Sequence, residues 1–503
     1  MRPAFLTTPI ALLAALTAGG SSDAPHGRPF IFNYENVLGT SLELKIDAGD
    51  YTAADRADAA ARREIERETG ILSAWDSQSE FNRWAASIGQ PVRVSPELFE
   101  TLALFDVWRD RTGGALDASA ETIVRVWKKA EREGREPSRA ELVAAVNDVR
   151  RPHWKLDGAA HTAAHLDHAP IALNSFAKSY IAGHAAGAAL AVSGVSSVVV
   201  NIGGDLVVRG PRSEAVDIAD PRCDAENCAP LANVEIQGRA IATSGSYRRG
   251  ADIAGRHYSH IVDPRTGMTA ESIISSTVAA PNSADAGAMA TAFSVLTPAE
   301  SRRLAASIRG VDYLIITNTG ERIASAAWSK LAARPQIRPP VALFSAAAAP
   351  DLPLELTVTV ELAEIGGYTR RPYLAIWVED PSGKAVRTIA LWYRKDRYLP
   401  EMHAWYRVAQ AAPAGDAYGF AHSIASATRS PGKYTFNWDG KDDTGKPVAR
   451  GKYTVFIEAA REHGTHQLMR HEMDFNNTPA RIDLKGNTEI AGASLDYHQL
   501  AAR

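Results

Sequence analysis

Cysteine, net charge and long apolar segments are all scarce in this chain of 503 residues. It has two cysteines, Cys223 and Cys228, and its formal net charge is −3. A nearly neutral chain has no global basic field to attract nucleic acid, and two cysteines alone make a poor metal site. In an oxidising exported compartment, their five-residue spacing favours a local disulfide over free thiols. No segment is apolar for long enough to form a stable membrane span.

Residues 1–29 have the pattern of a signal peptide followed by a linker. Arg2 supplies a positive charge, residues 5–18 form a short apolar stretch, and small residues follow. A bacterial lipoprotein would carry a lipidated cysteine at position 20, where this chain has Gly20. The sequence therefore predicts Sec-type export to the periplasm without a lipid anchor at this site.

The length predicts more than one domain, and the pattern changes near residue 335. Residues 30–335 are expected to form a mixed α+β domain, because helical and strand periodicities both occur. We expect helices over 53–70 (with Gly70 as the C-cap), 95–111, 138–149 and 177–192. We expect strands over 196–200, 206–208, 232–236, 240–244, 275–279 and 313–317.

Residues 336–352 are rich in proline and alanine and are expected to be a linker. Residues 353–503 show the alternation of an all-β domain, with strands expected over 354–360, 373–378 and 452–457. Turns rich in Asp, Gly and Pro between such strands predict an immunoglobulin-like sandwich. Its Trp405-Tyr406 pair, with His403 and Arg407, forms either a recognition surface for a protein partner or part of the sandwich core.

The segment from His260 to Gly267 (HIVDPRTG) places an imidazole, a carboxylate and a guanidinium within six positions. Ser259 and Ile261 flank the histidine as in a short strand, and proline and glycine supply the turn. A polar cluster held at a strand-to-turn junction suits catalysis. An ordinary polar hairpin is the alternative.

Other segments of the first domain give this cluster a context. They are 38–40 (LGT), 73–76 (SAWD), 112–117 (TGGALD), 177–178 (AK), 203–205 (GGD), 242–245 (ATSG) and 290–293 (ATAF). In this order, over residues 33–331, they resemble the ApbE family of FAD:protein FMN transferases. TGGALD and HIVDPRTG are the most specific matches. Residues 353–499 resemble an uncharacterised β-domain found behind some members of this family.

The resemblance implies an exported, Mg²⁺-dependent enzyme with FAD as its substrate. Such an enzyme attaches FMN to a Thr or Ser of an exported acceptor protein and releases AMP. His260 is the implied general base, a role that suits its near-neutral pKa. The implied nucleotide-binding residues are Leu38, Trp75, Ala115, Leu116, Asp117, Lys178, Gly203, Gly204, Thr243, Ser244, Ile261 and Arg265.

Several of these residues also have a structural interpretation. Trp75 would stack on the isoalloxazine ring, or it is a core aromatic. Lys178 would neutralise the pyrophosphate, or it is a solvated helix residue. Asp117 would accept hydrogen bonds from the nucleotide, or it is a turn or capping residue. The Gly203-Gly204 pair would bring backbone N–H groups to the phosphates, or it marks only a tight turn.

The sequence departs from the family pattern at the metal site. Gly287 stands where a Mg²⁺-ligating Asp is expected, and Ser179 stands where the family has Gly. Ala172 replaces a nucleotide-contacting Asp. Ser175 and Thr291 remain as oxygen ligands, and Asp285 is the candidate carboxylate only if the helix begins after it.

Three functions therefore remain open: a working transferase, a flavin-binding module with weakened turnover, and a scaffold. If the metal site is degenerate, Gly287→Asp is expected to raise Mg²⁺-dependent activity.

Overall fold

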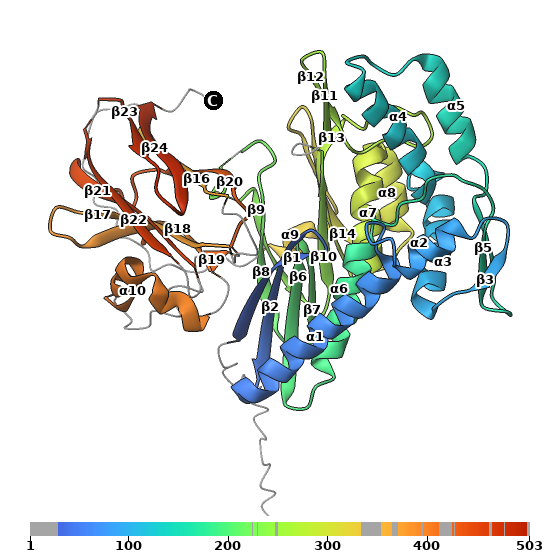
Figure 1. The fold of residues 1–503 in the computed structure, drawn as a ribbon, viewed down its shortest axis with the longest axis horizontal. Coiled ribbons are helices and arrows are strands. Elements are labelled where there is room, and N and C mark those ends of the chain that lie inside the picture. Colours follow the sequence, from blue (N-terminus) through green and yellow to red (C-terminus); the bar gives the residue numbers. More distant parts are fainter. Residues whose placement is uncertain are drawn as a thin grey trace, which may run out of the picture.

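The computed structural model describes residues 29–332, apart from 224, 229 and 247–249. It also describes residues 354–499, apart from 365–370, 394–395, 412–424, 427, 462–464 and 477. The expected linker, and the expected signal peptide except for residue 29, lie outside these residues. A mixed α+β region, blue to yellow in Figure 1, is followed by an all-β region, orange to red. No helix in the described ranges is long and apolar enough to cross a membrane.

An eight-stranded sheet forms the centre of the first region. Its strands follow the order β1-β2-β6-β7-β10-β13-β14-β15, and every neighbouring pair is antiparallel. The strands are β1 (Phe30–Val37), β2 (Thr40–Ala48), β6 (Val195–Ile202), β7 (Asp205–Arg209), β10 (Ala240–Gly245), β13 (Ile273–Ala280), β14 (Asp312–Thr317) and β15 (Arg322–Ala324). The expected strands around the Gly203-Gly204 turn are confirmed.

Both faces of this sheet are covered. Helices α1 (Tyr51–Leu72), α6 (Ala177–Leu190) and α7 (Ser283–Val295) pack on one face. The hairpin β8 (Ser213–Ile218) and β9 (Ala232–Gln237), with helix α9 (Trp328–Leu331), packs on the other. Val198 and Val200 face the helices, whereas Val199 packs with Trp328 on the opposite side. Burial on both faces explains why this strand is a continuous β-branched run.

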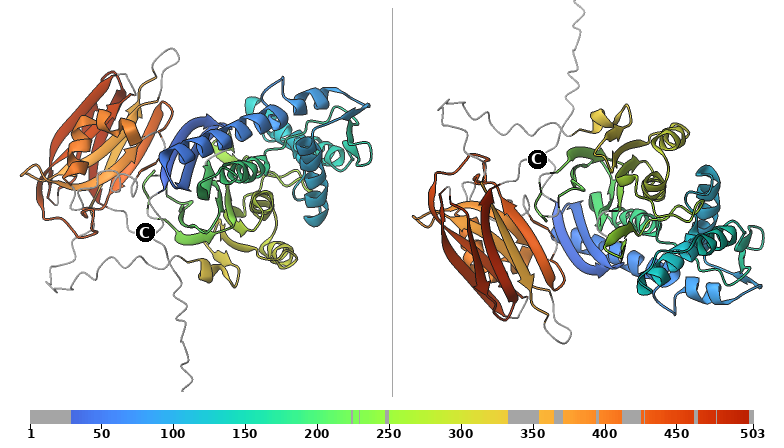
Figure 2. Two further views of the ribbon diagram at one scale, coloured as in Figure 1. Left: turned by 90° about the horizontal axis from the view of Figure 1, so that it is seen from below. Right: turned by 90° about the horizontal axis from the view of Figure 1, so that it is seen from above.

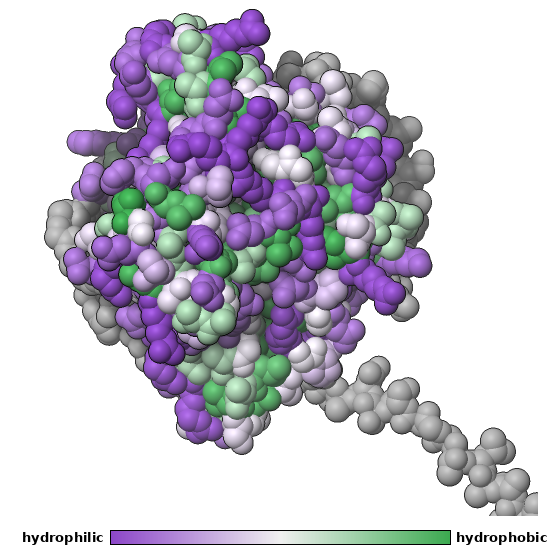
Figure 3. All heavy atoms as spheres, turned by 90° about the vertical axis from the view of Figure 1, so that its right-hand side faces the viewer, coloured by the Kyte–Doolittle hydropathy of each residue, from purple (hydrophilic) through white to green (hydrophobic). Residues whose placement is uncertain are grey.

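The remaining elements gather beyond one end of the helical layer (Figure 1). They are α2 (Glu80–Ala86), α3 (Pro96–Arg111), η1 (Ala118–Ala120), α4 (Glu121–Arg132), α5 (Arg139–Val149) and α8 (Pro298–Ala306). A small sheet of β3 (Pro91–Arg93), β5 (Thr162–His165) and β4 (Trp154–Asp157) and the hairpin β11 (Gly250–Ile253) with β12 (Arg256–Ser259) complete them. On this side of the molecule, hydrophilic residues are interspersed with small hydrophobic groups (Figure 3).

Helices α3 and α5 begin at the capping residues that the sequence predicts. Ser95 caps α3 by accepting a hydrogen bond from the N–H of Leu98, and Ser138 forms a capping box with Glu141 at α5. The expected end of the first helix at Gly70 is wrong. Helix α1 continues to Leu72, because the buried Leu72 packs in the core and extends the helix by half a turn.

The all-β region is a sandwich of two sheets, of order β20-β16-β24-β23 and β19-β18-β17-β21-β22 (Figure 2). The expected strands appear as β16 (Leu354–Leu362), β17 (Tyr373–Glu379) and β21 (Gly451–Ala460). The others are β18 (Ala385–Trp392), β19 (Ala425–Ser426), β20 (Gly432–Trp438), β22 (His466–Phe475), β23 (Ala480–Lys485) and β24 (Ile490–Gln499). A short helix η2 (Asp396–Glu401) and α10 (His403–Gln410) lie on one side. Trp405 of α10 is fully buried, so this indole belongs to the core and not to a recognition surface.

Cys223 and Cys228 form a disulfide, as their spacing indicates. The loop that it closes contacts strand β20 of the sandwich. The N–H of Glu226 donates to the carbonyl of Thr435 (2.8 Å). The side-chain amide of Asn227 pairs with both the N–H and the carbonyl of Asn437, each at 2.7 Å. The disulfide loop therefore connects the two regions.

Candidate functional site

The β1–β2 and β6–β7 turns lie at the same end of the central sheet, called here the turn end. Leu38 (φ 52°) and Gly39 (φ 76°) form the first turn. A left-handed conformation at a non-glycine residue costs about 1–3 kcal/mol and often marks a functional site. Gly203 (φ 59°) and Gly204 (φ 96°) form the second. A Cβ on Gly203 would lie 2.5 Å from Thr40 Oγ1, so only glycine allows the two turns to pack this closely.

Helix α6 begins at the turn end and places Lys178 there. The Nζ of Lys178 lies 4.0 Å from Oδ2 of Asp205, the first residue of β7. Burial raises the pKa of the Asp205 carboxyl, and the charge of Lys178 opposes that shift. Lys178 is therefore not simply a solvated helix residue, because a largely buried carboxylate holds its ammonium group beside the glycine turn.

Two further polar contacts bring distant segments together. Thr243 Oγ1 on β10 lies 2.9 Å from Thr277 Oγ1 on β13, and Ser244 follows on the same strand. Because β10 runs toward the turn end, these residues approach it. Thr291 of α7 donates a hydrogen bond to the backbone carbonyl of Ser175 (2.9 Å), just before α6. The two oxygen-bearing residues expected near the metal are thus adjacent.

The HIVDPRTG segment belongs to an excursion between β10 and β13, which leaves the sheet at the turn end. His260 is exposed and follows the last residue of β12, so the expected strand ends one residue before the histidine and does not include Ile261. Arg265 forms a two-point ion pair with Asp263 (2.9 and 3.0 Å). A third donor of its guanidinium contacts Glu300 (3.0 Å). These carboxylates hold the guanidinium in place and already occupy most of its donors.

The TGGALD segment lies beside the HIVDPRTG turn, and the residue after it, Ala118, bonds to the stretch that precedes α6. A Cβ on Gly114 would lie 3.8 Å from the Arg265 side chain, and the N–H of Ala172 donates to the carbonyl of Ala118 (2.9 Å). Ala115 and Leu116 are buried in the main core. These contacts fix the segment between the HIVDPRTG turn and the start of α6.

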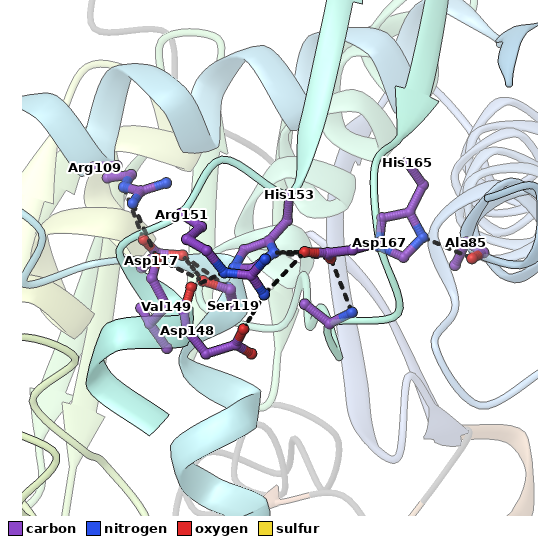
Figure 4. A network of polar contacts seen from close by, with 11 residues as sticks. Ala85, Arg109, Asp117, Ser119, Asp148, Val149, Arg151, His153, His165 and Asp167 are labelled. Carbon is purple, nitrogen blue, oxygen red and sulfur yellow. Dashed lines mark hydrogen bonds and ion pairs between the residues drawn. The ribbon is translucent and has the colours of Figure 1, made fainter. Parts of the chain in front are cut away.

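Asp117 uses both of its carboxylate oxygens within the protein (Figure 4). Oδ1 accepts hydrogen bonds from the N–H (2.8 Å) and hydroxyl (2.6 Å) of Ser119, and Oδ2 pairs with Arg109 (3.0 Å). This is the capping role, at the start of η1. A nucleotide contact of Asp117 stays a prediction.

Trp75 is 95% exposed, so the alternative that it is a core aromatic is wrong. Helix α1 runs from the opposite end of the sheet toward the turn end, and Trp75 lies three residues after its last residue, Leu72. Hydrogen bonds from the N–H groups of Trp75 and Asp76 to Ser73 Oγ (3.2 and 3.1 Å) shape this loop. The indole is thus free to form a stacking surface.

The residues at the expected metal position do not fit a Mg²⁺ site well. Helix α7 begins at Ser283, before Asp285, so the condition under which Asp285 could replace a carboxylate at 287 is not met. At about 100° per residue, Asp285 lies about 120° away from Thr291 around the helix axis, whereas Gly287 lies about 40° from it. Burial raises the pKa of Asp285, opposed by the charge of Arg111.

Close packing of α7 against α6 accounts for Gly287. A Cβ on Gly287 would lie 2.3 Å from Ser179 Oγ and 2.9 Å from Ser179 Cβ. One turn away the glycine is on α6 and the serine is on α7. A Cβ on Gly183 would lie 2.2 Å from Ser283 Oγ. Two of the three departures from the family pattern, Gly287 and Ser179, are therefore in direct contact.

Comparison with known proteins agrees with this geometry. The ApbE family matches residues 38–315, which is more than half of the chain. The chain belongs to the ApbE family. A second family, described as a predicted periplasmic protein of unknown function (DUF2271), matches residues 355–492. The all-β region is thus a DUF2271 domain, and the preceding region is called the ApbE domain below.

Relatives with an assigned name support the same relationship. A FAD:protein FMN transferase of Klebsiella pneumoniae is 27% identical over 57% of this chain and 83% of its own length. One of Treponema pallidum is 29% identical over 56% of this chain and 83% of its own. The ApbE protein of Thermotoga maritima, a crystal structure, shares the fold with a TM-score of 0.55 and 23% identity, covering 61% of this chain and all of that one.

Sequence reasoning did not single out two residues of this site. Asp205 was noted only as part of the glycine turn, although it contacts Lys178. Glu300 was missed, although it holds Arg265. Glu300 is also the third residue of α8 and forms a capping box with Thr297. That pattern predicts a helix start but not the ion pair with Arg265.

Proposed function

We propose that this chain is a transferase that moves FMN from FAD to a Thr or Ser hydroxyl of an exported protein and releases AMP. Membership of the ApbE family and the names of its relatives support the transferase class. The observation that carries the proposal is that both glycine turns and Lys178 lie at the turn end, where the excursion that contains the exposed His260 leaves the sheet. The DUF2271 match supports a periplasmic location.

In the proposed reaction the acceptor oxygen attacks the phosphorus of the FMN half of FAD. The pyrophosphate bond to the AMP half breaks, and the acceptor proton must leave. We assign the pyrophosphate to Lys178 and to the backbone N–H groups of Gly203 and Gly204, because cations and backbone donors stabilise the charge that develops on phosphoryl oxygens. We assign the proton to His260, whose exposure leaves the imidazole accessible to an incoming hydroxyl.

The flavin end of the substrate is assigned to Trp75, which offers an exposed aromatic face. Stacking contributes about 0.5–1.5 kcal/mol beyond the area buried. Leu38, Thr243, Ser244 and Ile261 are the proposed lining of the same site. Ala115, Leu116 and Asp117 would act through their backbone or by supporting the segment, since their side chains are buried. Arg265 is proposed to keep the HIVDPRTG turn in place.

Mg²⁺ dependence is the part of the family pattern that these residues fit least. Ser175 and Thr291 supply oxygen atoms, but position 287 supplies no carboxylate, and Mg²⁺ is usually bound through at least one.

The proposal is tested with the full chain and FAD, by measuring AMP formation chromatographically and covalent flavin fluorescence of periplasmic proteins after denaturing electrophoresis. His260→Ala is expected to abolish both signals while FAD binding, followed by flavin fluorescence, is kept. His257→Ala is the matched control, because His257 is an exposed histidine three residues earlier that pairs with Asp252 (2.9 Å). Equal activity of wild type and His260→Ala would refute the assignment of the base.

The missing carboxylate at 287 favours one other function, a flavin-binding module with weakened turnover. In that case the wild-type chain would bind FAD saturably and form no AMP at any Mg²⁺ concentration. If the chain binds no FAD, the result would instead support the scaffold function.

A further inference from the structure

Helices α1 and α6 bring two glutamates and a histidine together outside the proposed active site. Glu64 and Glu68 lie one turn apart on α1, and His184 faces them from α6. One ligand atom from each of the three lies within 4.8 Å of the others. Nδ1 of His184 is hydrogen-bonded to Oε1 of Glu68. Imidazole nitrogen and carboxylate oxygen form a donor set that Zn²⁺ and related divalent transition ions accept.

Glu68 provides an independent reason to expect a ligand. The residue is completely buried, and its second carboxylate oxygen, Oε2, has no hydrogen-bond partner in the described part of the chain. Leaving a buried acceptor unpaired is costly, and more so when it carries charge. The orphan oxygen therefore points to a ligand that brings positive charge.

A second buried pair in the same protein shows what a satisfied arrangement looks like. Glu458 of the DUF2271 domain is also completely buried, and it also bonds a histidine, His466 (2.5 Å). Its carboxylate, however, additionally accepts from the N–H groups of Ala404 (3.0 Å) and Trp405 (2.7 Å) at the start of α10. The two pairs differ in that backbone donors complete the shell of Glu458 and leave that of Glu68 open.

The charges around the cluster also favour a cation. Arg67 contacts Glu64 (2.8 Å), Glu97 of α3 (2.8 Å) and, more weakly, Glu68 (3.4 Å). Glu100 of α3 accepts a hydrogen bond from the nearby Tyr180 and acts electrostatically on His184. Four carboxylates thus surround one guanidinium and one imidazole.

We propose that Glu64, Glu68 and His184 bind a divalent transition-metal ion, for which Zn²⁺ is the best fit. Three protein ligands would leave the remaining coordination position to water. Side chains of Glu64 and His184 are 23% and 41% exposed, which gives the ion access from solvent. The ion would link α1, which leads to Trp75, to α6, which begins next to Lys178. The proposal does not depend on the transfer activity.

The test uses full-length protein stripped with EDTA and titrated with Zn²⁺ in a calorimeter, with Co²⁺ absorption as a spectroscopic check. Wild type is expected to bind one Zn²⁺ per chain at this cluster. Glu64→Gln and His184→Gln are expected to weaken binding by about 100-fold or more, because even outer-shell substitutions cost about 10–100-fold. Both residues are partly exposed, so these variants are more suitable than a change of the buried Glu68.

His466→Gln is the matched control, since it removes a histidine bonded to an equally buried glutamate. It is expected to keep wild-type Zn²⁺ affinity and the Zn²⁺-induced rise in the thermal midpoint, which His184→Gln should lose. Absence of saturable Zn²⁺ binding by wild type would overturn the proposal. So would unchanged affinity of His184→Gln, or loss of binding in His466→Gln, which would place the ion in the DUF2271 domain.

Discussion

Gly287→Asp on its own should fail to restore a metal site, contrary to what the sequence alone indicates. The reason is the position of Ser179 on the adjacent helix. The Cβ of any side chain at 287 would lie 2.3 Å from Ser179 Oγ and 2.9 Å from Ser179 Cβ. The hydroxyl can rotate away, but the Cβ is fixed to the backbone of α6. The two helices must therefore move apart, or the side chain cannot be accommodated.

The size of this conflict follows from a simpler substitution, Gly287→Ala. Alanine is favoured over glycine inside a helix by about 1 kcal/mol. Overpacking of a well-packed core costs about 1–3 kcal/mol. We expect Gly287→Ala to change the free energy of unfolding by between zero and about −2 kcal/mol. In a Ser179→Gly background both contacts with Ser179 disappear and only the Phe176 Cα, at 3.3 Å, stays close. The same substitution should then stabilise the protein by up to about 1 kcal/mol.

Urea unfolding of wild type, both single variants and the double variant measures this coupling. We expect a coupling energy of about 1–3 kcal/mol that favours the double variant. The pair Ser179→Gly/Gly287→Asp should then gain Mg²⁺ binding by calorimetry, and Gly287→Asp alone should not. A coupling energy below about 0.5 kcal/mol would refute the reasoning, because additive effects mean that the two positions vary independently.

Four further outcomes are expected. Trp75→Ala should weaken FAD binding about 5-fold, from about 1 kcal/mol of stacking, without lowering the thermal midpoint, because the side chain is 95% exposed. Lys178→Met should reduce AMP formation by at least about 100-fold, the effect of removing one donor to developing charge. Hydrogen bonds with Thr297, together with Arg265, lower the pKa of the Glu300 carboxyl in the folded protein. The stability that this carboxylate contributes is therefore present above its unfolded-state pKa, near 4.5, and is lost as the pH falls through the lower folded-state pKa. Glu300→Gln should flatten the acidic part of a pH–stability curve. Replacing Cys223 and Cys228 by serine should loosen the contact between the disulfide loop and strand β20 of the DUF2271 domain. Backbone hydrogen exchange in β20 should then become faster. Unchanged exchange would contradict the idea that the loop connects the two domains.

Local signals in the sequence predicted the parts of the fold that depend on neighbouring residues. The boundaries of α3 and α5 follow from Ser95 and Ser138, whose side chains satisfy backbone donors within three residues. The strands on either side of Gly203-Gly204 follow from a β-branched run and a turn that only glycine forms easily. Gly70 failed as a helix end because the burial of Leu72, a tertiary contact, outweighed the local preference.

Roles that depend on partners distant in sequence were not predictable in the same way. Trp75 and Trp405 are chemically equivalent in the sequence, yet one is 95% exposed and the other is fully buried. Burial of Trp405 depends on how α10 packs on the sandwich, which no local pattern encodes. Gly287 similarly reads as a lost ligand in the sequence, whereas the structure also shows it as the residue that lets α6 and α7 pack closely.

The disulfide loop shows the same distinction within one feature. The spacing of Cys223 and Cys228 was enough to predict the bond, because closure of a short loop is a local property. The strand that the loop contacts is 210 residues away from Asn227 and could not be inferred. Strand β20 lies at the edge of its sheet, where unpaired backbone groups invite pairing with other chains. Glu226 and Asn227 occupy the N–H of Asn437 and the carbonyls of Thr435 and Asn437. The loop therefore covers part of an exposed edge while it joins the two domains, which gives this disulfide a reason to lie where it does.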